Sequence, residues 1–382
     1  MQEIKKRRIV LASILKPVDD ARMSEKLGAT LASGYEVIII GQPSNYSTNF
    51  DNVQYSSLPG FSRLSYKRLV APLRVLRRVL VLRPAMLIVC TAELLPVALC
   101  TRMFTGATIV YDIQENYTQN IMHGRVWPRL IKPLLAFGVR LLEGISSVFI
   151  RHFLLAEQSY AEELKFIGRR FTVIENKAKR RAPAPATAAL PDQRRPIVSG
   201  DYAEIRLLFS GTLADTTGIW KAIEIAGCLH SIQPLVRLYV VGYAAQKHVR
   251  KRLRELAHQH PFISLVGIDH LVPHEEIVRA IHEAHFGIVA YPPNQSTWHS
   301  YPTKLYEYLG ACLPILLIDN PRWVALCAPY GAAVVFNAES PIDPLSLWER
   351  IQGSFYSMAP ANVYWEEEGV RLLQTIGSIL EV

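Results

Sequence analysis

The chain has 382 residues, too many for one ordinary hydrophobic core, so its length predicts two domains. Half of the residues are hydrophobic and a fifth are charged, which excludes an intrinsically disordered protein. The five cysteines are odd in number, widely spaced and without metal-ligand spacing, which excludes a disulfide scaffold and indicates the cytoplasm. The apolar run Ile9 to Leu15 is too short for a secretory signal, and we expect no membrane span.

Positive charge is concentrated in the first half of the chain. Residues 1–182 contain 27 lysines and arginines against 14 aspartates and glutamates, whereas the remaining residues contain 15 against 19. The net charge of the whole chain is +9. A cationic first half favours an anionic partner, either a membrane surface or a nucleic acid.

Apolar strands and helical segments alternate through this half. Arg8 to Leu15 and Tyr35 to Ile40 predict strands with a helix from Ala21 to Ser33 between them, which together form a βαβ unit. No glycine-rich phosphate loop joins the first strand to that helix, so a nicotinamide enzyme is excluded. Further strands are predicted at Met86 to Cys90, Thr108 to Asp112, Ser147 to Arg151 and Phe171 to Ile174, with helices between them.

The segment Arg63 to Val81 is basic and predicts an amphipathic helix that Pro72 would bend or divide. A stripe of leucines lies opposite the basic side chains: Leu69, Leu73, Leu76 and Leu80. We expect this stripe to pack on the sheet. The alternative is that the helix docks on anionic lipid, where each basic residue near the surface contributes about 1 kcal/mol.

Polar residues follow the strand that ends at Asp112. Ligands of open α/β sheets bind at the carboxyl ends of strands, so this position is suited to function. Asp112, Gln114 and Glu115 are candidate catalytic residues, which could take a proton from a sugar hydroxyl. Asn116 and Tyr117 are candidates for binding an acceptor. The alternative is that Asp112 only caps the next segment.

Residues 178–204 are rich in proline, alanine and basic side chains, and they predict a linker. Strands predicted after it, such as Ile263 to Val266, again alternate with helices and indicate a second doubly wound domain. Glycines follow three of these strands. Two of them, Gly211 and Gly242, would let a nucleotide approach the backbone closely.

The most specific segment begins at Ser300. Pro302 predicts the start of a helix, with Ser300 or Tyr301 as its cap. Lys304 then lies in the first turn, where a cation opposes the helix dipole, so we expect an anion such as phosphate in front of the N–H groups. Glu307 lies one turn further on the same face and could accept a hydrogen bond from a sugar hydroxyl. The alternative is an ordinary surface pair of lysine and glutamate.

Together these segments resemble a family 4 type glycosyltransferase of the two-Rossmann GT-B fold. The motifs that carry the resemblance are Asp20-Ala21-Arg22, Glu93-Leu94-Leu95-Pro96, Val110-Tyr111-Asp112-Ile113-Gln114-Glu115, Phe209-Ser210-Gly211-Thr212-Leu213 and, above all, Pro302-Thr303-Lys304-Leu305-Tyr306-Glu307. The resemblance implies an α/β protein with two Rossmann-like doubly wound domains facing across a cleft. It implies an acceptor domain at residues 1–177, a linker at 178–204, a donor domain at 205–358 and a last helix, within 359–382, that packs on the first domain.

The implied activity is transfer of a sugar from a nucleotide-sugar donor to a glycan or lipid-linked acceptor in bacterial-type surface polysaccharide synthesis. The family transfers with retention of anomeric configuration and uses neither a metal nor another cofactor. By the same resemblance, Glu307 binds the donor ribose, Lys304 binds the diphosphate and Arg22 contributes to the acceptor site. The other implied donor-binding residues are Gly211, Thr212, Thr217, Gly242, Ser300, Tyr301 and Thr303.

The chain departs from the family pattern at Thr212, Thr217, Gln114 and His299. His299, a candidate catalytic residue, replaces the first of two glutamates. Each departure removes a cation, a base or a charge partner, which leaves Lys304 as the clear side-chain cation for the diphosphate. A catalytically silent relative that binds nucleotide-sugar and scaffolds a glycan-assembly complex is therefore the alternative. A nucleic-acid partner is not expected, because basic and aromatic residues do not interleave. We expect a cytoplasmic protein, peripheral on the inner face of the membrane.

Overall fold

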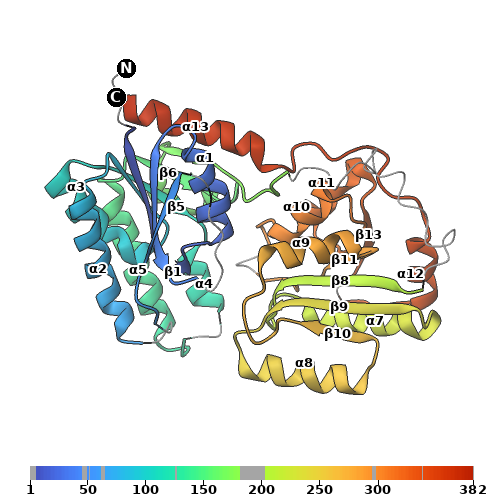
Figure 1. Ribbon diagram of the computed structural model, residues 1–382. Helices are drawn as coiled ribbons and strands as arrows, with labels where there is room; N and C mark the ends of the chain where they lie inside the picture. Colours follow the sequence, from blue (N-terminus) through green and yellow to red (C-terminus); the bar gives the residue numbers. More distant parts are fainter. Residues whose placement is uncertain are drawn as a thin grey trace. The chain divides into compact units, whose positions relative to one another are not determined.

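The structure is a computed structural model that describes residues 6–44, 50, 52–61, 65–124, 127–180, 203–294, 298–337 and 339–381. The chain divides into two compact units (Figure 1). Unit 1 comprises Met1–Asn176 and Trp365–Val382, and unit 2 comprises Lys177–Tyr364. Arg63 and most of the linker predicted at residues 178–204 lie outside the described residues.

Unit 1 is built on a parallel sheet, which in the described residues has seven strands in the order β3-β2-β1-β4-β5-β6-β7. Its strands are β1 (Arg8–Pro17), β2 (Glu36–Gln42), β3 (Val53–Ser57), β4 (Met86–Val89), β5 (Thr108–Ile113), β6 (His152–Leu155) and β7 (Phe171–Val173). Strands β1, β2, β4 and β5 are nearly continuous runs of buried residues, because helices cover both faces of the sheet. The strand order is that of a doubly wound α/β domain.

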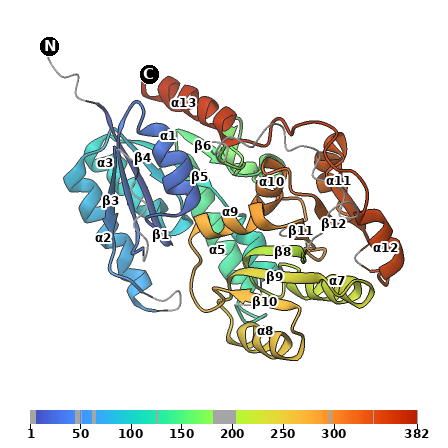
Figure 2. The same ribbon diagram turned by 45° about the vertical axis from the view of Figure 1, so that its right-hand side comes forward.

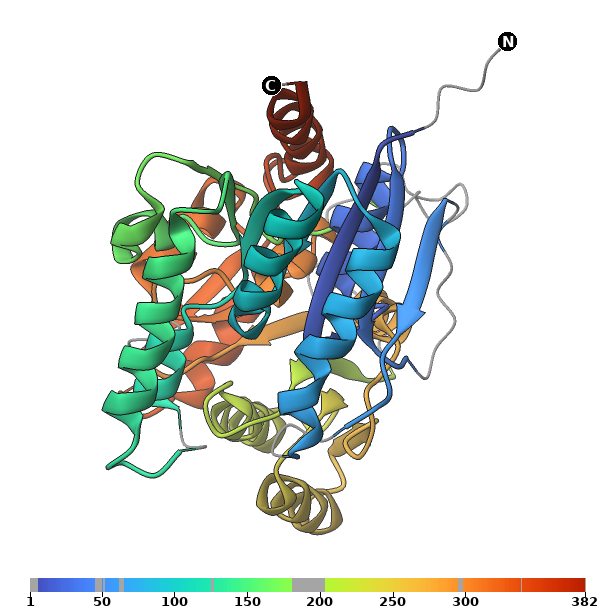
Figure 3. The ribbon, with the colours of Figure 1, turned by 90° about the vertical axis from the view of Figure 1, so that its left-hand side faces the viewer.

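The helices of unit 1 form two layers. On one face lie α2 (Lys67–Leu82), α3 (Leu95–Thr105) and α5 (Lys132–Ser147), which stand side by side in Figure 3. On the other face lie η1 (Ala21–Gly28), α1 (Ala29–Leu31) and the last helix, α13 (Trp365–Glu381), which buries Trp365, Leu372 and Ile376. The shorter helices are η2 (Ala92–Leu94), α4 (Tyr117–His123), α6 (Tyr160–Glu163) and η3 (Lys165–Ile167).

Helix α2 packs on the sheet through a different stripe from the one we expected. Its buried residues are Ala71, Val75 and Val79, which recur every fourth position. Leu69 and Leu73 are instead 80% and 64% exposed. The prediction that the leucine stripe packs on the sheet is therefore wrong for these two residues. The small alanine and the compact valines bring the helix close to the sheet, which leaves Leu69 and Leu73 on the outside, whereas Leu76 is partly buried against the core.

One further prediction of local structure was wrong. The strand expected at Ser147 to Arg151 is the end of α5 followed by a turn, in which the N–H groups of Phe149 and Ile150 bond to carbonyls of that helix end. Strand β6 begins only at His152, where pairing with β5 starts. Pro72 lies inside α2 without dividing it. Among the described residues, no helix combines the length and apolar character that a membrane span requires.

Unit 2 is built on a second parallel sheet, which in the described residues has six strands in the order β10-β9-β8-β11-β12-β13. Its strands are β8 (Ile205–Thr212), β9 (Val236–Tyr243), β10 (Ile263–Val266), β11 (Phe286–Val289), β12 (Ile315–Ile318) and β13 (Ala333–Phe336). Its helices are α7 (Ile219–Ile232), α8 (Lys247–Gln259), α9 (His274–Glu283), α10 (Thr303–Gly310), α11 (Pro321–Cys327), η5 (Ala328–Tyr330) and α12 (Pro344–Ile351). Helix α9 packs beside α10 (Figure 2), and α12 packs against α7.

Candidate functional site

The carboxyl ends of β8 and β9 meet the start of α10 at one edge of the unit 2 sheet. Gly211 of β8 pairs with Gly242 of β9. A Cβ atom on Gly242 would lie 1.8 Å from the carbonyl oxygen of Gly211, so this register admits no side chain there. Lys304 of α10 reaches the same edge, since its Cε atom would lie 3.9 Å from a Cβ placed on Gly211. Three predicted donor-site residues are therefore brought together.

A second close approach fixes the start of α7 against β11. Gly218, the N-cap of α7, has a φ of 84°, in the left-handed region that favours glycine. A Cβ atom there would lie 2.0 Å from the carbonyl oxygen of Ala290, just beyond β11. Glycine is thus required for the N-terminus of α7 to reach the edge of the sheet where β8 and β9 end.

Helix α10 begins one residue later than predicted. Pro302 occupies the N-cap position and Thr303 is the first helical residue, and no side chain caps the helix. The prediction that Ser300 or Tyr301 supplies the cap was wrong, because both lie outside the cap position. The carbonyl of Ser300 instead accepts a hydrogen bond of 2.9 Å from the indole of Trp323.

Tyr308 anchors α10 to the sheet. Its hydroxyl lies 2.9 Å from the hydroxyl of Ser210 on β8. Its ring covers Gly287 on β11, where a Cβ atom would lie 2.4 Å from the ring carbons. The contact with Gly287 lets the helix lie directly on the strand, and the orientation of Lys304 one turn earlier follows from it.

Lys304 is buried, with its ammonium group over aromatic rings. The residue is 5% exposed, and Nζ lies 3.7 Å from the ring centroid of Phe209 and 5.1 Å from that of Tyr291. Within the described residues, Nζ has no hydrogen-bond partner. Burial lowers the pKa of Lys304 to about 7, although the nearby Glu307 acts in the opposite direction. Ring faces stabilise a cation only in part, and a buried ammonium group without an anion is costly, so the position is suited to an anionic ligand.

Glu307 has a partner that the sequence did not reveal. Its Oε1 atom lies 2.8 Å from Nε2 of His274, the first residue of α9. Both side chains are largely buried. The two residues are 33 positions apart, and no local pattern connects them, so only the packing of α9 on α10 could identify the pair.

Three other predicted site residues lie in the described part of unit 2. The hydroxyl of Thr217 donates to the carbonyl of Ala214 and accepts from its N–H, so it closes the turn before α7. His299 is exposed, and its carbonyl accepts from Arg322 at 3.1 Å. Thr212, at the end of β8, is also exposed. Thr217 is thus a turn residue, and its uncharged hydroxyl does not replace the cation that the chain has lost from the family pattern.

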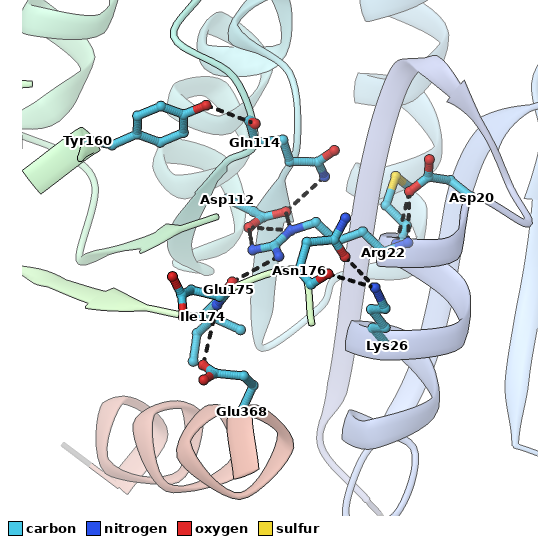
Figure 4. A network of polar contacts seen from close by, with 11 residues as sticks. Asp20, Arg22, Lys26, Asp112, Gln114, Tyr160, Ile174, Glu175, Asn176 and Glu368 are labelled. Carbon is cyan, nitrogen blue, oxygen red and sulfur yellow. Dashed lines mark hydrogen bonds and ion pairs between the residues drawn. The ribbon is translucent and has the colours of Figure 1, made fainter. Parts of the chain in front are cut away.

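In unit 1, the predicted catalytic Asp112 lies in a buried ion pair with Arg22 (Figure 4). Nε and Nη2 of Arg22 donate to the two carboxylate oxygens at 2.6–3.2 Å, and Gln114 donates to one of them at 2.8 Å. Arg22 also donates to the carbonyl of Ile174 at 2.9 Å. The ion pair is enclosed, since Asp112 is 0% and Arg22 4% exposed. The catalytic role of Asp112 and the contribution of Arg22 to an acceptor site stay predictions.

The residues that follow β5 start helix α4. Asn116 is the N-cap, whose Oδ1 accepts from the N–H of Gln119, and its amide donates to Glu163 at 2.6 Å. Asn116 therefore has the capping role that we considered for Asp112, and its role in binding an acceptor stays a prediction. Burial raises the pKa of Tyr117 well above its usual range. Glu115 is exposed, and its catalytic role stays a prediction.

Comparisons of sequence give no family. No protein-family model matches the chain, and no curated protein matches it. In the described residues, no group of three histidine, cysteine, aspartate or glutamate side chains could hold a metal ion.

Comparison of structure gives the fold. A sucrose-phosphate synthase from Thermosynechococcus elongatus matches with a TM-score of 0.68 and 12% identity, over 98% of this chain and 100% of that one. The catalytic domain of starch synthase IV from Arabidopsis thaliana, bound to ADP and acarbose, matches with a TM-score of 0.67 and 10% identity, over 99% and 100% of the two chains. A trehalose-6-phosphate protein from E. coli bound with UDP-2-fluoro glucose matches with a TM-score of 0.58 and 11% identity, over 98% and 95%. The chain is therefore an α/β protein with the two Rossmann-like parallel sheets of the GT-B fold.

Proposed function

We propose that the protein is a glycosyltransferase that binds the diphosphate of a nucleotide-sugar donor beside Lys304. The observation that carries this proposal is the buried ammonium group of Lys304, without a hydrogen-bond partner among the described residues, beside Gly211 and in the first turn of α10. A diphosphate there would receive both the ammonium charge and the N–H groups of the helix start. It would also raise the pKa of Lys304, so that the lysine is protonated in the complex.

The chemistry follows from the leaving group. When the bond between the anomeric carbon and the diphosphate breaks, negative charge accumulates on the diphosphate oxygens. A fixed cation and a helix N-terminus stabilise that charge without a metal ion. Glu307 would accept a hydrogen bond from a ribose hydroxyl, and the contact with His274 would hold its carboxylate in position.

Further proposals concern the protein family, the acceptor and the location in the cell. We propose a family 4 type enzyme that retains anomeric configuration, needs no metal and transfers to a glycan or lipid-linked acceptor in bacterial-type surface polysaccharide synthesis. The motif from Pro302 to Glu307 and the cationic first half support this proposal. A cytoplasmic location at the inner membrane face is proposed because all five cysteines are free thiols.

The alternative function is nucleotide-sugar binding without turnover. It is favoured by the exposed Thr212 and by the turn role of Thr217, since neither supplies a second cation for the diphosphate. In that case Lys304 and Glu307 would still bind the donor, and the protein would act as a scaffold in glycan assembly.

Release of nucleoside diphosphate tests both functions. The protein is incubated with UDP-sugars and ADP-sugars first, because two of the matching structures hold UDP-2-fluoro glucose or ADP, and then with GDP-sugars. We expect release with one donor class, and loss of release and of donor binding in Lys304→Ala and Glu307→Ala. Matched controls are Lys221→Ala and Glu224→Ala, a lysine–glutamate pair with the same spacing in the same unit.

The outcomes separate the alternatives. If the protein binds a donor but releases no nucleoside diphosphate with any acceptor extract that is added, the catalytically silent relative is supported. Absence of binding to all three donor classes refutes the donor site. Activity that survives EDTA and gives a product with the donor's anomeric configuration by NMR supports the metal-independent, retaining reaction.

A further inference from the structure

Exposed large hydrophobic side chains are concentrated in one part of unit 1. Within the described residues, sixteen of twenty-three such side chains lie between residues 66 and 149. Many project from α2, α3 and α5, which stand side by side on one face of the sheet (Figure 3). The most exposed on these helices are between 73% and 80% exposed: Leu69, Val81, Met103, Phe104 and Leu134. We call the outward surface of these three helices the α2–α3–α5 face.

The same face is strongly basic. Helices α2, α3 and α5, all of whose residues are described, carry eight basic side chains: Lys67, Arg68, Arg74, Arg77, Arg78, Arg102, Lys132 and Arg140. Their one acidic residue is Glu143, which is 2% exposed and accepts from the hydroxyl of Tyr111. Glu143 nevertheless pairs with Arg140, whose Nη1 lies 3.4 Å from its carboxylate, and Arg68 pairs with Glu93 of η2. The other six basic side chains give the face its net positive charge.

Apolar and basic groups meet in a hollow on α2. The hollow has a volume of about 370 Å³ and is lined by Leu73, Leu76, Arg77, Leu80 and Val81. Aliphatic side chains and a guanidinium group thus share one concave patch. An acyl chain would contact the aliphatic side chains, and a lipid phosphate would bind the guanidinium group.

We propose that the α2–α3–α5 face docks on an anionic phospholipid bilayer. Its apolar side chains would enter the boundary between headgroups and acyl chains, and its basic side chains would bind lipid phosphates. A second copy of the chain fits poorly, because the six basic side chains outside these two ion pairs would repel the same surface of a partner. A nucleic acid would leave the apolar side chains in water.

Helix α8 provides an internal comparison for this proposal. It is also basic, with lysine or arginine at positions 247, 250, 251, 252 and 254, but it exposes no large hydrophobic side chain among its residues, all of which are described. Charge alone therefore does not distinguish the two surfaces. Only the α2–α3–α5 face combines charge with exposed apolar groups.

Co-sedimentation with vesicles tests the proposal. The full-length protein is mixed with vesicles of phosphatidylcholine alone or of phosphatidylcholine with phosphatidylglycerol. We expect sedimentation with the anionic vesicles only, weakened by salt. Neutralising Arg74 and Arg77 to glutamine should weaken binding roughly 25-fold, since each basic residue contributes about 1 kcal/mol, a factor of about five. The charge-matched control is Lys247→Gln with Lys251→Gln on α8, which should bind like the wild type.

The apolar contribution is tested separately. Leu69→Ser with Phe137→Ser should weaken binding even at low salt, whereas Leu345→Ser, at a 61% exposed leucine of α12, should not. The unfolding midpoint of each variant confirms that it is folded.

Three results would overturn the proposal: equal sedimentation with neutral vesicles, equal loss in the α8 control, or a concentration-dependent dimer that Leu69→Ser abolishes. This inference deepens the proposed function by naming a partner surface, yet it depends on unit 1 alone. Nucleoside diphosphate release can therefore be absent while vesicle binding is observed. Vesicle binding can equally be absent while nucleoside diphosphate is released.

Discussion

Replacing Lys304 by methionine removes a buried ammonium group and keeps most of the side-chain volume. Burial lowers the pKa of Lys304 from 10.5 to about 7. Below the lower value, the lysine is protonated in both folded and unfolded chains, and the folded state bears the full cost of burying the charge, roughly 5 kcal/mol from this difference in pKa. Between the two values the folded protein is neutral at this position and the unfolded chain is charged, so the cost falls as the pH rises.

Lys304→Met is therefore expected to be more stable than the wild type without ligand. The gain should be close to 5 kcal/mol at about pH 6 and nearer to 2 kcal/mol at about pH 9. For a domain of this size, 1 kcal/mol moves the unfolding midpoint by about 2–4 °C, so the difference at the lower pH should exceed 10 °C by rough estimate. UDP or ADP at 100 times its dissociation constant should stabilise the wild type by about 2.7 kcal/mol and leave the variant unchanged.

Differential scanning fluorimetry at the two pH values, with and without nucleotide, measures both effects. Lys221→Met, at a lysine of α7 that pairs with Glu224, is the control and should show neither effect. A Lys304→Met protein that is less stable than the wild type at the lower pH would refute the reasoning. In that case the ammonium group would be satisfied within the protein, and no anion would be needed to explain it.

The remaining predictions concern stability. Gly242→Ala should lower the unfolding midpoint of unit 2 by several degrees, because its Cβ would lie 1.8 Å from a carbonyl of β8, whereas Gly227→Ala, which meets a ring carbon at 3.6 Å, should not. Burial raises the pKa of Glu143 from 4.5 to about 7, so the stability of the folded state falls as the pH rises through this range. Glu143→Gln should therefore match the wild type near pH 4.5 and exceed it in urea unfolding above neutral pH, and a pH-independent difference would contradict this assignment. Asp112→Asn should cost about 3–5 kcal/mol by stranding the charge of Arg22, and Asp112→Asn with Arg22→Met should recover part of it in a double-mutant cycle.

Local composition predicted most strands of both sheets. The strand predicted at Met86 to Cys90 is β4 (Met86–Val89), every residue of which is buried, and Ile263 to Val266 was predicted with its observed bounds. Such runs can be recognised in the sequence because strands of a parallel sheet that is covered on both faces have aliphatic residues at successive positions. Strand β3 (Val53–Ser57) was not predicted, since it lies at the sheet edge and carries polar residues.

The candidate site was predictable only in part. The sequence by itself placed Lys304 and Glu307 at the start of one helix, because proline and helical spacing are local signals. Tertiary structure alone decided that Lys304 is buried over Phe209 and that Glu307 pairs with His274. Those contacts join residues many tens of positions apart, and no local period encodes them.

The same division explains two features of unit 1. The sequence showed that α2 is amphipathic, but two apolar stripes were available, and only packing on the sheet buried Ala71, Val75 and Val79 and left Leu69 and Leu73 exposed. It also showed a carboxylate at the end of β5, while the fold brought Arg22 to Asp112 from 90 residues away. Periodicity fixes which residues can share a face, whereas the partner of that face is set by the chain's long-range contacts.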